Sequence, residues 1–146
     1  MTRKIIFLDV DGVLVTTKSM EHWCDEFGCH SFDPQAVRVL NQIVYRTGAE
    51  IVLSSTWRFL HNKDEFNELA SQSNLHYPII EYTPFFGHRN NEIKKWLSNN
   101  PDVADYLVID DEDLSLDFEK FIRTEIQSGL NPNHLNDAVR ILGEKQ

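Results

Sequence analysis

Residues 5–14, with the sequence IIFLDVDGVL, constrain the fold more than any other part of the chain. An apolar run of this kind is typical of a buried strand in a parallel sheet. The run ends in Asp9 and Asp11, and Gly12 follows. Ligands of open α/β sheets bind beyond the carboxyl ends of the strands, so both acids lie where a site is expected. The turn that Gly12 permits lets the two carboxylates face one small ligand.

Two later apolar segments also end in polar residues. Taken alone, Asp9 and Asp11 after the first apolar run are also compatible with a surface turn that carries two solvated aspartates. Three strands that end in carboxylates or hydroxyls favour a site for a metal ion and a phosphate instead. The two later segments are residues 51–53, followed by Ser54 and Ser55, and residues 106–109, followed by Asp110 and Asp111.

Strand patterns alternate with helical patterns along the whole chain, which predicts an α/β fold with a parallel sheet of about five strands and covering helices. The length of 146 residues favours one domain over residues 1–146. The predicted strands are residues 5–8, 49–54, 77–82, 105–110 and 121–124. The predicted helices lie at residues 19–27, 34–47 and 62–71, around residues 93–97, and at residues 131–142.

Charge and hydropathy limit the partners of the chain. Fourteen basic and 23 acidic residues give a net charge of -9, which opposes charge-driven binding to nucleic acid or to an anionic membrane. No apolar run approaches the roughly 20 residues that cross a bilayer. The basic start at residues 2–4 precedes an apolar stretch that Asp9 and Asp11 interrupt, so no secretory signal is expected. These features predict a cytoplasmic protein without membrane contacts.

The two cysteines offer a second candidate site. Two cysteines are too few for a disulfide framework, and free thiols suit a reducing compartment. A zinc site is one reading, but the spacing fits no standard zinc pattern. Packing of the thiols on an apolar helical face is the favoured reading. The zinc candidates are His22, Cys24, Cys29 and His30, and the helical face would contain Met20, Trp23, Cys24 and Phe27.

Three ordered motifs resemble those of the haloacid dehalogenase-like (HAD) hydrolase superfamily. They are Asp9-Val10-Asp11-Gly12 after an apolar strand, Ser54 at the end of the second strand, and Asp110-Asp111 after a later strand. The resemblance implies a Rossmann-like three-layer sandwich with helices on both faces of the sheet and a minimal cap. It also implies Mg²⁺-dependent phosphohydrolase activity through an aspartyl-phosphate. Residues 51–58 look more like the small HAD domains found alone or attached to RNA-repair proteins than like sugar phosphatases.

The resemblance assigns roles to the acids. Asp9 would be the nucleophile, and Asp11 would be the general acid and then the general base. Asp9, Asp110, Asp111 and Asp11, the last through its backbone carbonyl, would hold Mg²⁺, with Asp111 either behind the direct ligands or in contact with the metal through water. A phosphate ester repels an anionic nucleophile, so such a site needs a cation. The alternative for Asp110 and Asp111 is the start of a solvated acidic loop.

Phosphate binding is expected from hydroxyl, amide and basic groups. Ser54 would contribute its hydroxyl and Ser55 its backbone amide, whereas the plain alternative for Ser54 is a turn or helix-cap serine. The third motif of the superfamily is a basic residue near the start of a later helix. Arg89 is favoured because a guanidinium before the helix can reach the carboxyl edge of the sheet, and Lys94 is the second choice.

The sequence is compatible with several classes of substrate. The first insertion spans only about residues 13–32, so an open site is expected that admits a phosphorylated nucleic-acid end, a phosphoprotein or a small ester. The adjacent Phe85 and Phe86 can stack a base or serve as core anchors. A noncatalytic, metal-dependent phosphate-binding module is the main alternative. A receiver-like phosphoacceptor is disfavoured because residues 79–82 contain no aspartate.

Overall fold

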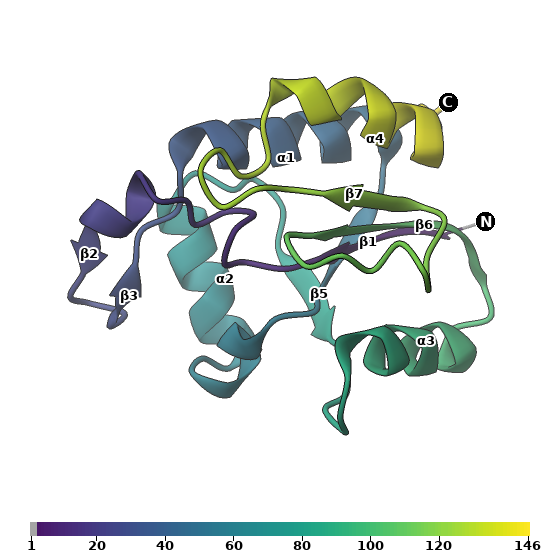
Figure 1. Ribbon diagram of the computed structural model, residues 1–146, viewed down its shortest axis with the longest axis horizontal. Coiled ribbons are helices and arrows are strands. Elements are labelled where there is room, and N and C mark those ends of the chain that lie inside the picture. The colour runs from purple at the N-terminus through teal and green to yellow at the C-terminus, as the bar shows by residue number, and fades with distance from the viewer. Residues whose placement is uncertain (1–2) are drawn as a thin grey trace.

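A computed structural model describes residues 3–146 and contains a five-stranded parallel sheet (Figure 1). The strand order is β5-β4-β1-β6-β7, so the first strand of the chain is the central one. Each neighbouring pair is parallel. The strands are β1 (Arg3–Leu8), β4 (Glu50–Leu53), β5 (Ile79–Tyr82), β6 (Val103–Asp110) and β7 (Phe121–Arg123). These five strands confirm the predicted parallel sheet.

Four α-helices connect or follow the strands, and their ends carry the expected local signals. The side chain of Asp33 caps the first helix by accepting from the Gln35 NH, and Gly48 ends that helix in the left-handed region at φ 72°. The helices are α1 (Pro34–Thr47), α2 (Lys63–Gln72), α3 (Arg89–Asn99) and α4 (Leu135–Leu142). A 3-10 turn at Pro132–His134 precedes α4, so the predicted helix over residues 131–142 forms in two parts.

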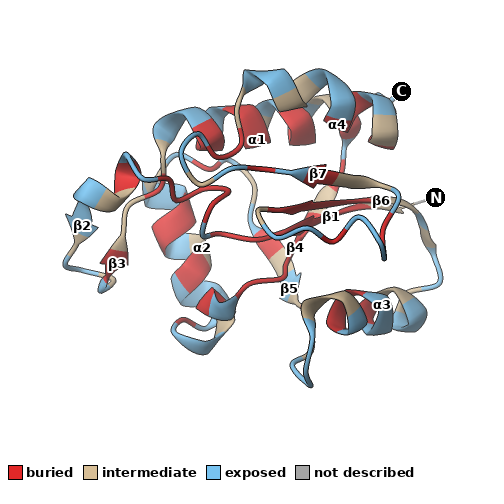
Figure 2. Ribbon diagram, in the orientation of Figure 1, coloured by how far each residue is buried: buried red, intermediate tan, exposed pale blue. Residues whose placement is uncertain are grey.

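The central strand β1 alternates between two hydrophobic cores. Ile6 and Leu8 point into the core shared with α1, α2 and α4, whereas Ile5 and Phe7 point into the core shared with α3. Figure 1 shows α1 and α4 side by side on one face of the sheet and α3 on the other. β1 and the end of β6 are buried from both sides (Figure 2). The chain therefore has the three-layer architecture that the sequence predicts.

The register of the central strands brings the ends of distant segments together. Leu8 lies opposite Leu53 of β4 and opposite Ile109 of β6. The residues that follow these three are therefore neighbours at the carboxyl edge. Backbone hydrogen bonds continue the ladder there, from Ser54 N to Leu8 O at 2.8 Å and from Asp9 N to Ile109 O at 3.1 Å.

The predicted helix over residues 19–27 is wrong. The segment forms a 3-10 turn at Ser19–Glu21 and a short hairpin of β2 (Trp23–Cys24) and β3 (Cys29–His30). Gly28 takes a positive φ of 64°, and its NH donates to the Cys24 carbonyl, so the chain reverses where the helix was expected. This hairpin and the 3-10 turn are the elements between β1 and α1, which agrees with a minimal cap.

The predicted packing of the cysteines holds only in part. Cys29 is buried, and burial raises the pKa of its thiol to about 11. Cys24 packs partly against the same core, whereas Trp23 is 57% exposed. Within residues 3–146, the predicted zinc candidates do not form a group of three metal-ligating side chains.

The segment after β1 turns sharply back into the core. The NH groups of Val13, Leu14 and Val15 all donate to the Val10 carbonyl, and these residues are buried. Gly12 makes the turn at φ 81°, and a Cβ at this position would lie 2.4 Å from Asp111 Oδ2. A side chain at position 12 would therefore collide with a carboxylate that follows β6.

The described helices do not include a membrane span. None of those in residues 3–146 combines the length and the apolar composition that a bilayer crossing requires.

The turn at Gly12 generates a testable prediction. Gly28→Ala should lower the free energy of unfolding by about 1–2 kcal/mol, the ordinary cost of the left-handed region for a residue with a Cβ. Gly12→Ala should cost more, because Gly28 has open space around it whereas Gly12 faces Asp111. Urea unfolding of both variants measures the difference. Equal losses would show that the close approach of Asp111 does not constrain this turn.

Candidate active site

A row of buried polar residues crosses the carboxyl edge of the sheet. Each of the five strands contributes one residue, either its last or the one directly after it. Parallel strands end at one edge, so the topology alone gathers these side chains. The row is Thr83 (β5), Ser54 (β4), Asp9 (β1), Asp110 (β6) and Thr124 (β7), in spatial order. The three strand ends that the sequence singles out are its central members.

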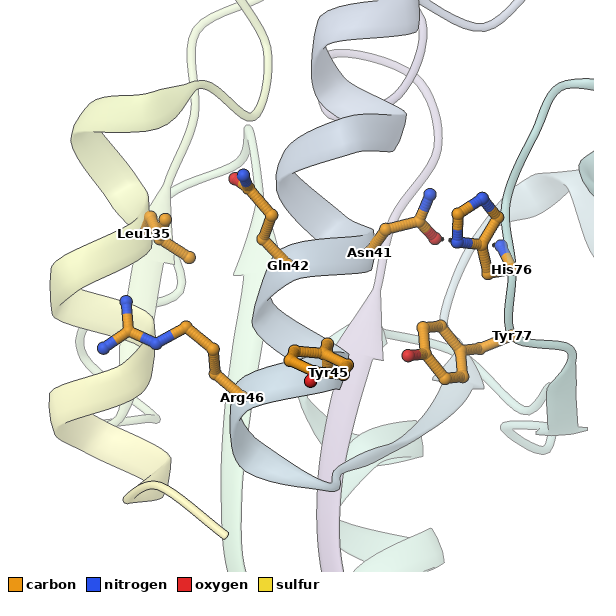
Figure 3. A pocket seen from close by; sticks show the side chains of 7 residues that line it. All are labelled: Asn41, Gln42, Tyr45, Arg46, His76, Tyr77 and Leu135. Atoms are coloured by element: carbon orange, nitrogen blue, oxygen red, sulfur yellow. Dashed lines mark hydrogen bonds between the residues drawn. The ribbon is translucent and has the colours of Figure 1, made fainter.

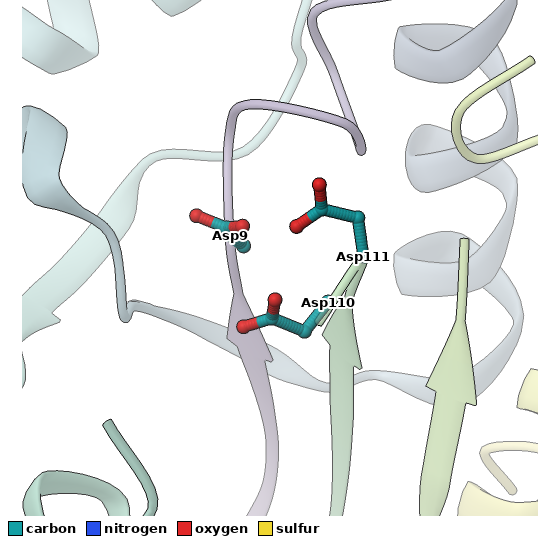
Figure 4. A group of neighbouring side chains, drawn as sticks. All are labelled: Asp9, Asp110 and Asp111. Atoms are coloured by element: carbon teal, nitrogen blue, oxygen red, sulfur yellow. The ribbon is translucent and has the colours of Figure 1, made fainter. Parts of the chain in front are cut away.

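Three carboxylates meet in the middle of this edge. One oxygen from each of Asp9, Asp110 and Asp111 lies within 4.8 Å of the others (Figure 4). We call these three residues the acid cluster. Asp9 and Asp110 are 4% and 1% exposed, and Asp111 is partly exposed. Asp111 approaches as closely as the other two because the turn at Gly12 leaves room for it. In residues 3–146 this is the one group of three or more such side chains close enough to hold a metal ion.

Arg89 balances part of the negative charge. Its Nη1 donates to Asp110 Oδ2 at 2.8 Å, to Asp110 Oδ1 at 3.0 Å and to Asp9 Oδ2 at 3.3 Å. Arg89 is the first residue of α3 rather than a residue before it, and from there its guanidinium reaches the edge of the sheet. It therefore lies where the sequence prediction requires the basic residue of the third motif.

Burial and mutual repulsion make the ionised acid cluster costly. Burial raises the pKa of Asp9 well above its usual range, and the neighbouring Asp110 raises it further. Burial also raises the pKa of Asp110, although Arg89 opposes the rise at both carboxyls. At neutral pH the site therefore favours additional positive charge.

Asp11 lies outside the acid cluster. Its side chain is exposed, and its Oδ1 accepts a hydrogen bond from Trp57 Nε1 at 3.1 Å. Trp57 is 5% exposed and packs beside Phe32 and Phe66. Trp57 also holds the Asp11 side chain through this hydrogen bond, which was not predicted from the sequence. No local pattern in the sequence signals this contact, because it joins residues 46 positions apart.

The two serines differ in their surroundings. The hydroxyl of Ser54 is buried, and no side chain or backbone group in residues 3–146 pairs with it. Buried hydroxyls rarely lack a partner, so this one is available to a ligand at the edge. The hydroxyl of Ser55 accepts from the Trp57 NH and caps the 3-10 turn Thr56–Phe59. The capping serine is thus Ser55, whereas the Ser54 hydroxyl, for which a cap or turn was the alternative, caps nothing in residues 3–146. The proposed role of the Ser55 backbone amide stays a prediction.

Lys94 points to a different partner. Its Nζ pairs with Asp117 at 2.7 Å, half exposed to solvent. None of the ion pairs that Lys94 forms in the described chain involves the acid cluster. Of the two predicted basic residues, the structure brings only Arg89 to the acids.

The oxygens at the edge match the preferences of a hard divalent cation. Mg²⁺ and Ca²⁺ bind carboxylate and carbonyl oxygens, and Mg²⁺ is usually held by one or two carboxylates together with substrate phosphates. Asp9, Asp110 and Asp111 supply such oxygens, and their combined charge exceeds what Arg89 can neutralise. The residues present therefore fit a divalent metal ion.

Of two hollows on the surface, one lies apart from the acid cluster and the other borders it. A hollow of about 500 Å³ beside α1 is lined by residues such as Tyr45, His76 and Tyr77 (Figure 3) and shares none with the acid cluster. A second hollow of about 540 Å³ borders Asp111 and includes Arg123. The acid cluster thus has open space directly beside it, as expected for a domain with a small cap.

Removal of one acid tests the cation site. Mg²⁺ at about 100 times its dissociation constant should raise the free energy of unfolding by about 2.7 kcal/mol, because only the folded chain gathers the three acids. Asp110→Asn should abolish this gain. Asp113→Asn is the matched control, since Asp113 is exposed in the same loop and bonds only Ser115. Thermal unfolding with and without Mg²⁺ measures the effect, and equal responses of the two variants would exclude this site.

Comparison with known families agrees with this arrangement. A family model described as the HAD domain in Swiss Army Knife RNA repair proteins matches residues 5–135. Comparisons with curated proteins and with solved structures gave no match. The matched range contains the acid cluster, Ser54 and Arg89. It covers most of the chain and confirms the resemblance drawn from the sequence, so the chain belongs to this family of HAD domains.

Proposed function

We propose that the protein is a Mg²⁺-dependent phosphohydrolase that removes phosphate from monoesters through an aspartyl-phosphate at Asp9. The supporting observation is the meeting of the acid cluster, Arg89 and the unpaired Ser54 hydroxyl at one edge of the sheet. These groups provide a nucleophile, a cation site and phosphate ligands within one small region. The HAD family match supports hydrolase chemistry of this kind.

The charges of the site explain how an anion can attack an anionic ester. A divalent cation held by Asp9, Asp110 and Asp111 would supply positive charge to the phosphoryl oxygens and to the attacking carboxylate. Arg89 already donates to Asp9 and Asp110, and its remaining N–H groups can bind phosphate oxygens. The Ser54 hydroxyl donates to another phosphate oxygen.

The first displacement transfers the phosphoryl group to the protein. An oxygen of Asp9 forms a bond to phosphorus while the bond from phosphorus to the ester oxygen breaks. Asp11 gives its proton to the leaving alkoxide, so an alcohol departs and Asp11 is left ionised. The Trp57 Nε1–H bond to Asp11 Oδ1 fixes this side chain and leaves the other oxygen free for proton transfer.

The second displacement restores the enzyme. Asp11 takes a proton from water, and the water oxygen forms a bond to phosphorus. The bond between phosphorus and the Asp9 oxygen then breaks, which releases inorganic phosphate and frees the carboxylate. Asp11 thereby regains the proton that it gave away in the first step.

The natural substrate in this proposal is the phosphorylated end of a nucleic acid. The description of the matching family names RNA repair proteins, which favours a nucleic-acid substrate. The small elements between β1 and α1 leave room for a bulky ester. The net charge of -9 means that binding must come from local contacts rather than from the overall field.

Replacement of the two proposed catalytic acids tests the reaction. With Mg²⁺ and p-nitrophenyl phosphate, Asp9→Asn should abolish turnover because no nucleophile remains. Asp11→Asn should lower kcat by roughly 10²- to 10⁴-fold, the usual contribution of a general acid. Asp113→Asn should retain activity and serves as the control. A wild-type chain that binds Mg²⁺ but hydrolyses no phosphate ester would favour a noncatalytic phosphate-binding module.

A second pair of variants separates the two basic residues. Arg89→Ala should reduce kcat/KM by at least roughly tenfold, because a charge-assisted hydrogen bond to phosphate and the balance of charge at the acids are both lost. Lys94→Ala should stay within about twofold of the wild type, since Lys94 pairs with Asp117. Steady-state kinetics with p-nitrophenyl phosphate decides, and a greater loss in Lys94→Ala would reverse the assignment.

A further inference from the structure

Three phenylalanines form an exposed surface beside the active site. Phe59, Phe85 and Phe86 are 54%, 65% and 55% exposed, and we call them the aromatic surface. The rings of Phe59 and Phe85 meet edge to face, with centroids 4.6 Å apart and planes at 81°. Exposed apolar groups that gather in one place commonly mark a binding site. These rings come from two separate segments, one after β4 and one after β5.

A buried ion pair between Arg58 and Glu92 contacts the residues of the aromatic surface. Arg58 Nη2 lies 2.7 Å from Glu92 Oε1, and the two side chains are 7% and 2% exposed. The Arg58 guanidinium lies 5.0 Å from the ring centre of Phe59 and 5.6 Å from that of Phe85. Glu92 Oε2 also accepts from the Phe86 NH at 3.0 Å. Arg58 thus contacts two of the rings, and Glu92 holds the backbone of the third phenylalanine.

Both segments that carry the aromatic surface also reach the carboxyl edge of the sheet, where the acid cluster lies. The Phe59 segment starts at Ser54, and Arg58 Nη1 bonds the hydroxyl of Thr83 in the polar row at 3.1 Å. Phe86 precedes Arg89 by three residues, a span of at most about 11 Å between their Cα atoms. Since Arg89 contacts Asp9, a phosphate at Asp9 lies within reach of a short chain that crosses the aromatic surface.

The charges of the two segments select the kind of ligand. Residues 54–62 and 83–91 contain no Asp or Glu, in a chain that has 23 acidic residues. They carry Arg58, Arg89 and two histidines, and the charge of Arg58 is paired with Glu92, which directly follows the second segment. Flat apolar rings near Arg89, whose remaining N–H groups can bind phosphate, match a single-stranded nucleic acid, which stacks its bases on aromatic side chains and presents phosphates to basic ones.

We propose that Phe59 and Phe85 form a base-stacking subsite for a single-stranded oligonucleotide whose terminal phosphate lies at Asp9. The proposal rests on the proposed function, because it takes the catalytic edge as the place of the phosphate. The strand runs from the acid cluster past Arg89 onto the aromatic surface, and a base near the phosphorylated end stacks there. Recognition is tolerant of sequence, because every base has a flat face.

Binding measurements on a chain that cannot turn over test the subsite. The Asp9→Asn variant, with Mg²⁺, is titrated against fluorescent tetraribonucleotides phosphorylated at the 5′ or the 3′ end. Each position is replaced in turn by an abasic residue. We expect one abasic position to weaken binding by roughly tenfold, the loss of one stacked base. In Asp9→Asn/Phe85→Ala the intact oligonucleotide should bind about as weakly, and the same abasic replacement should have no further effect.

Matched variants guard against a general effect on folding or stickiness. Tyr45 is 64% exposed on α1 and lines the hollow beside that helix, so Tyr45→Ala removes an equally exposed ring away from the catalytic edge. It should leave the abasic effect unchanged. Phe85→Leu keeps apolar bulk but loses the flat ring, and it should behave like Phe85→Ala. If Phe85→Ala fails to fold, the leucine variant carries the test.

The outcomes separate this proposal from the proposed function. An abasic effect of the same size in Phe85→Ala and Phe85→Leu as in their parent would overturn the subsite, as would undetectable binding of every oligonucleotide. Hydrolysis of p-nitrophenyl phosphate by the wild type would still stand in that case. Conversely, base-dependent binding through Phe85 by a wild-type chain that hydrolyses no ester would support the subsite and overturn the phosphohydrolase.

Discussion

The repulsion among three carboxylates is the constraint on which the rest of the active site depends. Asp9, Asp110 and Asp111 lie close together and largely away from water, where like charges are costly. One guanidinium, that of Arg89, is hydrogen-bonded to two of them. This contact fixes the start of α3 against the edge of the sheet. The fold itself therefore arranges the charges of the candidate site.

Much of the fold could be predicted because its signals are local. The apolar run before Asp9 and the capping pair at Asp33 and Pro34 each depend on a few neighbouring residues. The prediction of a helix over residues 19–27 was wrong because the apolar spacing of this segment matches a helix by coincidence. There Gly28 reverses the chain into a hairpin, and the periodicity cannot reveal that turn.

The site could be predicted as far as strand order allows. Parallel strands that end in polar residues bring those residues to one edge of the sheet. The gathering of Asp9, Ser54 and Asp110 could therefore be predicted from the sequence. The place of Asp111 depends instead on a contact with Gly12 from a distant loop. The pairing of Arg58 with Glu92 likewise joins separate segments, and no local pattern encodes it. Tertiary contacts of this kind decide which of several plausible basic or acidic residues takes part.

The position of β1 at the centre of the sheet has a consequence for biosynthesis. β1 precedes its partners β4 and β6 along the chain and therefore leaves the ribosome before either of them, and β6 ends at Asp110. One edge of this apolar strand therefore stays unpaired until β4 has been translated, and the other until β6 has been translated. The three carboxylates of the acid cluster meet only after β6 has been made, so a chain that ends before Asp111 cannot form the candidate site.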